Sequence, residues 1–255
     1  MQITVLGKSP AMPDAGGACS GYLVSEGDFR LLLDCGTGVF AKLRMFCEPN
    51  DVDTILITHM HADHVADLLP FGHALSFPLR HLAHRPRLLV PPGGAQRIQE
   101  ISEVFGIGYQ LEQAFAVEEY EPASVLTVGP LETRFQEVPH YIRTWACELR
   151  TPIGRRFTFG ADCAPNEALP AFAAHSDLLI LEATEGTSVQ PADDDGIRGH
   201  MTAQEAGEMA RAAQARRLVI THFSDQLDPE AVRAAAAVSF GADVDLAHGG
   251  AVYVV

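Results

Sequence analysis

The sequence has no long apolar run and few aromatic residues. Its apolar stretches fall well short of the roughly 20 residues that a helix needs to cross a bilayer. Residues 1–7 lack the basic start and long apolar core of a secretory signal. At 47% hydrophobic and 20% charged residues, the composition is that of a globular protein in water. We therefore expect a cytoplasmic protein with no membrane-spanning segment.

Basic residues are also scarce, with 18 Lys and Arg against 33 Asp and Glu, which gives a net charge of −15. Contacts from Lys and Arg to phosphates supply most of the affinity of proteins for nucleic acids. A large RNA or DNA is therefore not the expected partner. A small anionic substrate fits better, because bound divalent cations would offset the acidic balance locally.

Paired cysteines are missing as well. The five cysteines are an odd number and form no C-x-x-C pair, which predicts free and mostly buried thiols. The alternative is that one or two of them lie near a functional site, since Cys35 and Cys163 each follow an aspartate. The five are Cys19, Cys35, Cys47, Cys147 and Cys163.

Short apolar segments alternate with helical patterns in both halves of the chain. No repeat, low-complexity tract or linker divides residues 1–255, so we predict one domain. Strands and helices in both halves favour two mixed β-sheets packed face to face with helices outside, a four-layer αββα sandwich. The expected helices span residues 39–46, 63–75, 94–105, 165–174, 202–215 and 229–239.

One segment, His59-Met60-His61-Ala62-Asp63-His64, carries four metal-ligand side chains within six residues and follows the apolar strand 54–57. Side chains alternate along a strand, so His59 and His61 share a face. Asp63 and His64 follow where the chain turns into a helix. Four ligands are more than one tetrahedral ion needs from a single segment, which favours His59 and His61 on one ion and Asp63 and His64 on a second. Zinc suits these donors, with manganese or iron as alternatives.

The H-x-H-x-D-H motif resembles the signature of the metallo-β-lactamase superfamily, and further matches follow in the expected order over essentially the whole chain. The resemblance implies that His140 is the third ligand of the first ion and His222 the last ligand of the second. It implies that Asp162 bridges both ions. Asp34, at the end of an early strand, is expected to support a ligand histidine from behind rather than to bind metal.

Metal-assisted hydrolysis is the chemistry that such a site performs. Two ions about 3.5–4 Å apart can share a bridging water and lower its pKa enough to supply hydroxide near neutral pH. We place Asp63 among both the ligands and the catalytic groups of this centre.

Two further segments resemble the ribonuclease Z branch of the superfamily. Glu182-Ala183-Thr184 is similar to its E-A-T, and Gly199-His200-Met201-Thr202-Ala203 to its G-H-S-T-A, with Met in place of Ser. The resemblance implies that His200 gives a proton to the leaving group and that Glu182 orients it. It also implies a homodimer. The alternative is structural, with His200 beside a helix cap at Thr202 and Glu182 facing a loop.

The chain departs from that branch between His140 and Asp162, which are 22 positions apart (162 minus 140). This leaves no room for the basic arm that clamps transfer RNA in long-arm ribonucleases Z. We therefore predict a phosphodiesterase for a small phosphodiester or nucleotide. The alternatives are a lactonase, thioesterase or β-lactamase, a tRNA 3′-processing enzyme, and a non-catalytic binding protein.

Two other segments give weaker indications of function. Residues 71–87 are locally basic and could line the mouth of the site, although a solvated helix end and loop is the favoured interpretation. Asp193-Asp194-Asp195-Gly196 does not have EF-hand spacing and is interpreted as an acidic loop. The basic segment contains His73, Arg80, His81, His84, Arg85 and Arg87.

Overall fold

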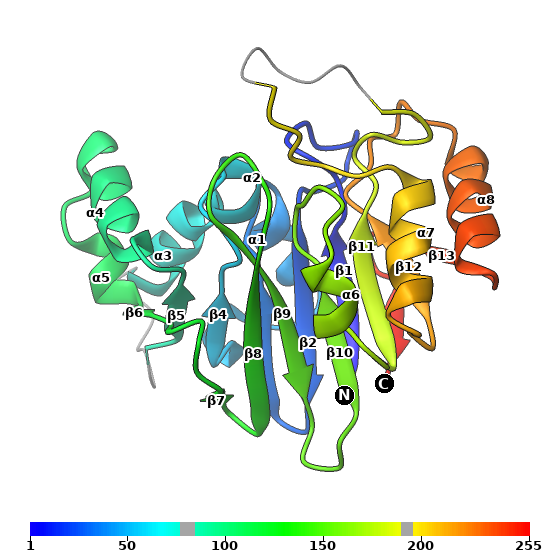
Figure 1. The fold of residues 1–255 in the computed structure, drawn as a ribbon. Coiled ribbons are helices and arrows are strands. Elements are labelled where there is room, and N and C mark those ends of the chain that lie inside the picture. The colour runs from blue at the N-terminus through cyan, green and yellow to red at the C-terminus, as the bar shows by residue number, and fades with distance from the viewer. Residues whose placement is uncertain (77–84, 190–195) are drawn as a thin grey trace.

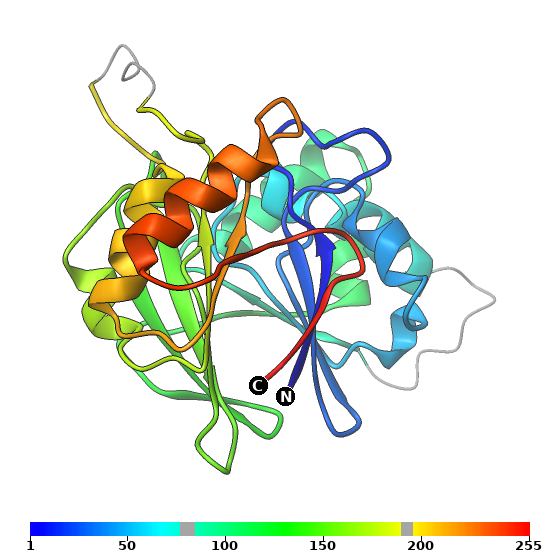
Figure 2. The same cartoon turned by 90° about the vertical axis from the view of Figure 1, so that its right-hand side faces the viewer.

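Two seven-stranded β-sheets face each other in the computed structural model, which describes residues 1–76, 85–189 and 196–255. Helices cover the outer surface of each sheet (Figure 1, Figure 2). The two chain ends lie side by side, and the Met1 amino group donates to the Val255 carbonyl at 3.1 Å. The predicted αββα sandwich with two mixed sheets is confirmed.

The first sheet has the order β14-β1-β2-β3-β4-β5-β6. Its strands β3 to β6 are parallel, while β1, β2 and β14 join antiparallel, so the sheet is mixed. The strands are β1 Gln2–Gly7, β2 Gly21–Glu26, β3 Phe29–Leu33, β4 Thr54–Leu56, β5 Arg87–Val90, β6 Ala116–Glu119 and β14 Val252–Val254.

The second sheet has the order β13-β12-β11-β10-β9-β8-β7. Strands β10 to β13 are parallel, and β7 to β10 pair antiparallel. Strand β8 therefore runs in the same direction as β10 and ends at the same edge. The strands are β7 Leu126–Val128, β8 Leu131–Val138, β9 Thr144–Arg150, β10 Arg156–Phe159, β11 Leu178–Glu182, β12 Leu218–Thr221 and β13 Asp245–Leu246.

The helices divide between the two outer faces (Figure 1). Against the first sheet lie α1 Val39–Leu43, the short 3-10 turn η1 Pro49–Asp51, α2 Ala62–Val65, α3 Leu68–Ser76, α4 Gly94–Val104 and α5 Gln110–Ala114. Against the second lie α6 Ala168–Phe172, α7 Ala203–Ala212 and α8 Pro229–Phe240.

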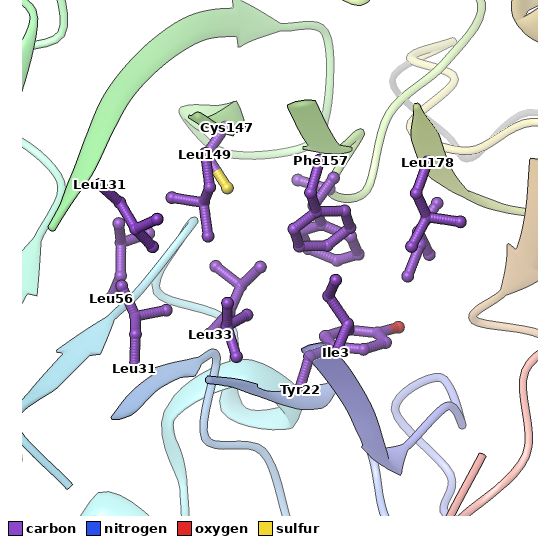
Figure 3. Close-up of a cluster of buried hydrophobic side chains, with 14 of the residues drawn as sticks. Ile3, Tyr22, Leu31, Leu33, Leu56, Leu131, Cys147, Leu149, Phe157 and Leu178 are labelled. Atoms are coloured by element: carbon purple, nitrogen blue, oxygen red, sulfur yellow. The ribbon is translucent and has the colours of Figure 1, made fainter. Parts of the chain in front are cut away.

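Alternation along the strands builds three apolar layers. In β3, Leu31 and Leu33 enter the core between the sheets, and Leu32 faces the first helix layer. In β11, Leu178 enters the same inter-sheet core and Leu179 faces the second helix layer. Figure 3 shows side chains of both sheets meeting between them. Each such fully buried leucine contributes roughly 1.5–3 kcal/mol, which makes this core the support beneath the strand ends.

The helix expected over residues 63–75 is interrupted, and α2 and α3 are separate. Pro70 has no N–H to donate to the carbonyl of Ala66, so a continuous helix would lose that bond. Pro70 is tolerated in the first turn of α3. Between the helices, the Asp67 carboxylate accepts the Phe40 N–H at 2.8 Å and its own N–H donates to Cys35 at 3.1 Å. These bonds fix the break.

The five cysteines all lie in described residues and are free thiols, four of them buried, as predicted. Burial raises the pKa of Cys35 and Cys163 well above the ordinary value of a thiol. Both lie beside the site, but they contribute backbone N–H groups: Cys35 donates to the His64 carbonyl and Cys163 to the Glu182 carboxylate.

Within the described parts of the chain, no helix is both long and apolar enough to cross a membrane.

Candidate metal centre and active site

Six strand ends bring the predicted site residues to one edge of the sandwich, where α2 lies in Figure 1. Parallel strands end at the same edge of a sheet, and polar side chains that follow them converge there. From the first sheet come Asp34 after β3 and His59 after β4; from the second come His140 after β8, Asp162 after β10, Glu182 at the end of β11 and His222 after β12.

A first ligand group consists of His59, His61 and His140, whose ligand atoms all lie within 4.8 Å of one another. The Nε2 atom of His140 is 3.0 Å from Nδ1 of His61. The other ring nitrogen of His140 donates to the Gly199 carbonyl at 2.7 Å, so Nε2 is left to face the centre. Burial lowers the pKa of His140 to about 4, which keeps the imidazole neutral as a metal ligand requires.

A second group consists of Asp63, His64, Asp162 and His222, again within 4.8 Å and all buried. The Asp162 Oδ2 atom lies 3.3 Å from Nε2 of both His64 and His222. It also lies 3.8 Å from Nε2 of His59 in the first group. Asp162 therefore stands between the groups, where a bridging carboxylate would be.

The donor set fits divalent cations. Among the described residues, the buried atoms His59 Nε2, His64 Nε2 and Asp162 Oδ1 have no hydrogen-bond partner. Buried polar atoms nearly always have one, and each unmet group costs about 1–3 kcal/mol. Three such atoms meet among seven imidazole and carboxylate side chains, which is the donor chemistry of zinc and similar ions.

Asp34 supports the ligand histidines from below, as predicted, and is fully buried. Its Oδ2 atom is 2.8 Å from His64 Nδ1. The Thr58 hydroxyl donates to Asp34 at 2.9 Å and lies 3.0 Å from His59 Nδ1. Because its single proton goes to Asp34, this hydroxyl accepts the N–H of His59. Both histidines therefore turn Nε2 toward the centre.

Glu182 builds a matching unit in the second half. Its Oε1 atom is 2.8 Å from His200 Nδ1 and accepts the Cys163 N–H at 2.7 Å. Its Oε2 atom accepts the Thr184 hydroxyl at 2.6 Å, and that hydroxyl lies 2.8 Å from His222 Nδ1. Because the single proton of this hydroxyl goes to Glu182, Thr184 accepts the N–H of His222. One carboxylate thus orients His200 directly and His222 through Thr184.

Two threonines of the site were not among the residues predicted from the sequence. Thr58 directly precedes His59, and Thr184 follows Glu182 by two residues in the E-A-T segment. A hydroxyl next to a ligand or to a catalytic carboxylate is the signal that could have found them.

His200 differs from the candidate ligands in its environment. Burial lowers the pKa of His200, but Glu182 outweighs this and raises it to about 9. Its side chain is 18% exposed, and its ring centre lies 4.9 Å from that of His140. Its position also allows ligand-type groupings with Asp162 or with His222. The fixed Nδ1–H and the partial exposure favour a proton donor at the rim of the centre.

The segment that carries His200 is held at both ends. Thr202 caps α7, and its hydroxyl accepts the Glu205 N–H at 3.3 Å. Arg198 donates to Glu185 at 2.8 Å and to Glu205 at 2.5 Å. The helix cap at Thr202, which is the structural alternative for this segment, is therefore present. His200 contacts Glu182 at the same time.

Comparison with known proteins identifies the family. Residues 29–223 match the family described as "Beta-lactamase superfamily domain". The chain belongs to the metallo-β-lactamase superfamily. It is 30% identical to "Probable metallo-hydrolase YhfI" of Bacillus subtilis over 99% of both chains. It is 28% identical to a ribonuclease Z of Methanopyrus kandleri, over 89% of this chain and 88% of that protein.

Solved structures of superfamily members show the same fold. The crystal structure of YhfI superposes with a TM-score of 0.87 at 27% identity, covering 99% of this chain and 98% of that one. The short form of human tRNase Z superposes with a TM-score of 0.78 at 22% identity, over 100% and 99% of the two chains. Family, ligand groups and hydrolase relative together make this superfamily member a metal-dependent hydrolase.

The interval between His140 and Asp162 is as short as expected. It is described throughout and holds β9, β10 and their turn. No additional arm projects there.

The basic segment after α3 is described only in part. Arg87 pairs with Glu118 at 2.8 Å, and Arg85 donates to the main-chain carbonyls of Glu112 and Phe115. Both cations are therefore engaged in polar contacts within the chain. His73, also in the basic segment, lies in α3 with its Nδ1 atom 3.1 Å from Gln110 Nε2. The other predictions for this region and for the acidic loop concern Arg80, His81, His84, Asp193, Asp194 and Asp195, which lie outside the described residues.

Proposed function

We propose that this hydrolase is a phosphodiesterase that acts on a small phosphodiester or nucleotide with two divalent ions, zinc being the first choice. The observation that carries the proposal is His200, held by Glu182 at 2.8 Å beside both ligand groups. The ligand groups could support the hydrolysis of many kinds of bond. A proton donor held in place favours a substrate whose leaving group is an alkoxide. A thiolate, by contrast, leaves without a proton.

Seven side chains would hold the ions. When bound, two divalent ions supply a water activated near neutral pH and stabilise charge on the group under attack. Asp34 and the two threonines fix the ring orientation of three of the ligand histidines, which keeps their Nε2 atoms directed inward. The seven are His59, His61 and His140 on one side, Asp63, His64 and His222 on the other, and Asp162 between them.

His200 would protonate the leaving oxygen. Its Nδ1–H is bound to Glu182, so its other ring nitrogen is the one that can donate. The carboxylate favours the charged ring, as the raised pKa of about 9 for His200 indicates. General acids of this kind contribute about 10²–10⁴-fold to a rate.

Three observations support a small substrate. The net charge is −15, only strands and a turn lie between His140 and Asp162, and Arg85 and Arg87 are engaged in polar contacts within the chain. A ribonuclease cleaves phosphodiesters, so the ribonuclease Z relatives support a phosphodiester as the bond that is cleaved. They do not support the small size of the substrate. Lactone, thioester or β-lactam hydrolysis and tRNA 3′-processing remain the competing activities.

A homodimer and a cytoplasmic location stay predictions. Light scattering coupled to size-exclusion chromatography would measure the first, and fractionation of cells that produce the protein would measure the second.

The activity is tested on one purified sample, prepared without chelators and with its metal content measured. The substrates are bis(p-nitrophenyl) phosphate, cyclic AMP, a precursor tRNA, a lactone, a chromogenic β-lactam and a glutathione thioester. We expect turnover of the small phosphodiesters. Turnover of the lactone or thioester with no diester hydrolysed would overturn the proposal.

A further inference from the structure

We propose that Arg143 is the platform of a subsite, beside the metal centre, on which a nucleobase of the substrate stacks. The proposal rests on the proposed phosphodiesterase function, because it concerns the part of the diester that is retained when the leaving group departs. It makes a nucleotide diester, rather than a simple alkyl diester, the preferred substrate class.

A cleft of about 330 Å³ lies where the ends of β5 and β8 approach each other. Its lining includes Met60, which stands between the ligands His59 and His61, and Ile142, which is two residues after His140. The lining contains none of the three histidines, but the cleft borders both chain segments that carry them. Its volume is at the lower end of the range for sites that bind small molecules.

Arg143 borders this cleft as a flat plate that is already held in place. Its Nε and Nη2 atoms donate to the two carboxylate oxygens of Glu137 at 2.9 and 3.1 Å. The centre of its guanidinium lies 4.8 Å from the ring centre of Trp145, which is buried in the inter-sheet core. The Arg143 side chain is nevertheless 63% exposed. One face thus rests on Trp145, and the remaining surface is open to a ligand.

The chemistry of the cleft suits a nucleobase. Guanidinium planes stack on bases, and a fork fixed by a carboxylate loses little conformational freedom when it does so. Met60, Pro92 and Ile142 offer apolar contact, and Gln96, whose Nε2 donates to Glu100 at 2.9 Å, offers its amide oxygen to the edge of a base. Trp145, Arg143 and the base would form three stacked layers.

The position relative to His200 agrees with this assignment. The ring of His140 lies 4.9 Å from that of His61 and 4.9 Å from that of His200. The rings of His61 and His200 thus both lie beside that of His140, and Met60 directly precedes His61 in the chain. The leaving group would point toward His200, and the retained nucleoside toward Arg143.

Two esters with the same leaving group test the subsite. They are thymidine 5′-(p-nitrophenyl phosphate) and methyl p-nitrophenyl phosphate, which differ only in the retained group. For the wild type we expect kcat/KM to favour the thymidine ester by about tenfold or more, a typical contribution of one stacked base. Arg143→Ala should remove most of that preference, and so should Arg143→Lys, which keeps the charge but not the plane.

Arg155→Ala is the matched control. Arg155 is also an exposed arginine on a carboxylate, 3.3 Å from Asp177, but it lies in the turn between β9 and β10. This variant should leave both the activities and the preference at wild-type values.

A second readout does not depend on turnover. Trp145 is the only tryptophan, so its fluorescence reports on the layer beneath Arg143. Thymidine 5′-monophosphate, titrated into the full-length protein with and without a chelator, should give a saturable change in the wild type and in Arg155→Ala. Arg143→Lys should weaken this binding about tenfold.

The outcomes separate the two proposals. If both esters are hydrolysed and the preference is the same in the wild type and both Arg143 variants, the subsite is wrong and the phosphodiesterase stands. If neither ester is hydrolysed, the phosphodiesterase fails. The fluorescence titration then decides the subsite alone, and no binding of the nucleotide would overturn it.

Discussion

The two halves of the site contain the same arrangement of a carboxylate, a threonine hydroxyl and two histidines, but the two arrangements have different proposed roles. In the first half, Asp34 holds His64 directly and His59 through the Thr58 hydroxyl. In the second half, Glu182 holds one histidine directly and another through a threonine hydroxyl in the same way. Both carboxylates are buried, and both hydroxyls accept a ring N–H that fixes a histidine.

The difference lies in what the directly held histidine faces. His64 is fully buried and belongs to the second ligand group. His200 has the same kind of carboxylate partner but is 18% exposed at the rim. Local geometry alone therefore does not separate a ligand from a proton donor, whereas access to a substrate does. The first unit is expected to govern metal binding, and the second to govern metal binding and proton transfer together.

The largest effect should come from Asp162→Asn, which alters the carboxylate that stands between both ligand groups. We expect activity to fall about a thousandfold or more, because metal charge stabilisation is worth several kcal/mol. Metal content should drop below two ions per chain in elemental analysis. Asp177→Asn, at a surface ion pair, is the control. Two retained ions with near wild-type activity would show that Asp162 bridges nothing.

His200→Ala should lower kcat by about 10²–10⁴-fold, the usual contribution of a general acid. Metal content should stay at the wild-type value, since His200 is assigned to the leaving group. The loss should be larger for an alkoxide leaving group, as in cyclic AMP, than for p-nitrophenolate, which needs less protonation. Unchanged activity, or loss of an ion, would reverse the assignment of His200.

Thr58→Val and Thr184→Val compare the two units directly, since valine keeps the shape of threonine and removes the hydroxyl. Each should weaken metal binding about 10–100-fold, as is usual when the partner of a ligand histidine is lost. Excess zinc should restore kcat in Thr58→Val. In Thr184→Val it should restore kcat only in part, because Glu182 has lost a contact that orients it toward His200. Equal rescue of both variants by zinc would mean that the two units do the same work.

Arg198→Gln should have the smallest effect. Arg198 joins Glu185 and Glu205 on either side of the segment that carries His200. Its loss should loosen the placement of His200 and lower kcat by less than about tenfold, with KM and metal content unchanged. Steady-state kinetics with elemental analysis would measure this. A larger effect on KM than on kcat would assign Arg198 to substrate binding instead.

The convergence of the candidate ligands at one edge could be predicted from the sequence because the chemistry and the topology coincide. His59 to His64 form a dense motif, and His140, Asp162 and His222 each follow an apolar strand. Strands of an αββα sandwich that run in one direction deliver their ends to one edge, so segments far apart in sequence had to meet there.

Other features depend on tertiary contacts that a local pattern indicates only in part. Thr58 and Thr184 matter only because Asp34 and Glu182 come within hydrogen-bond reach of them. The Arg143 platform needs Glu137 and Trp145 on neighbouring strands of the hairpin β8–β9. The prediction of one helix over residues 63–75 was wrong, because it did not take account of Pro70 and of the Asp67 contacts that separate α2 from α3.

The most direct test of the central claim is a zinc titration of the metal-free protein, with bis(p-nitrophenyl) phosphate hydrolysis measured at each step. Two ligand groups joined by Asp162 predict that activity rises until two ions are bound per chain and then stays constant. Full activity with a single ion, or no hydrolysis of the diester with two, would contradict a dinuclear phosphodiesterase.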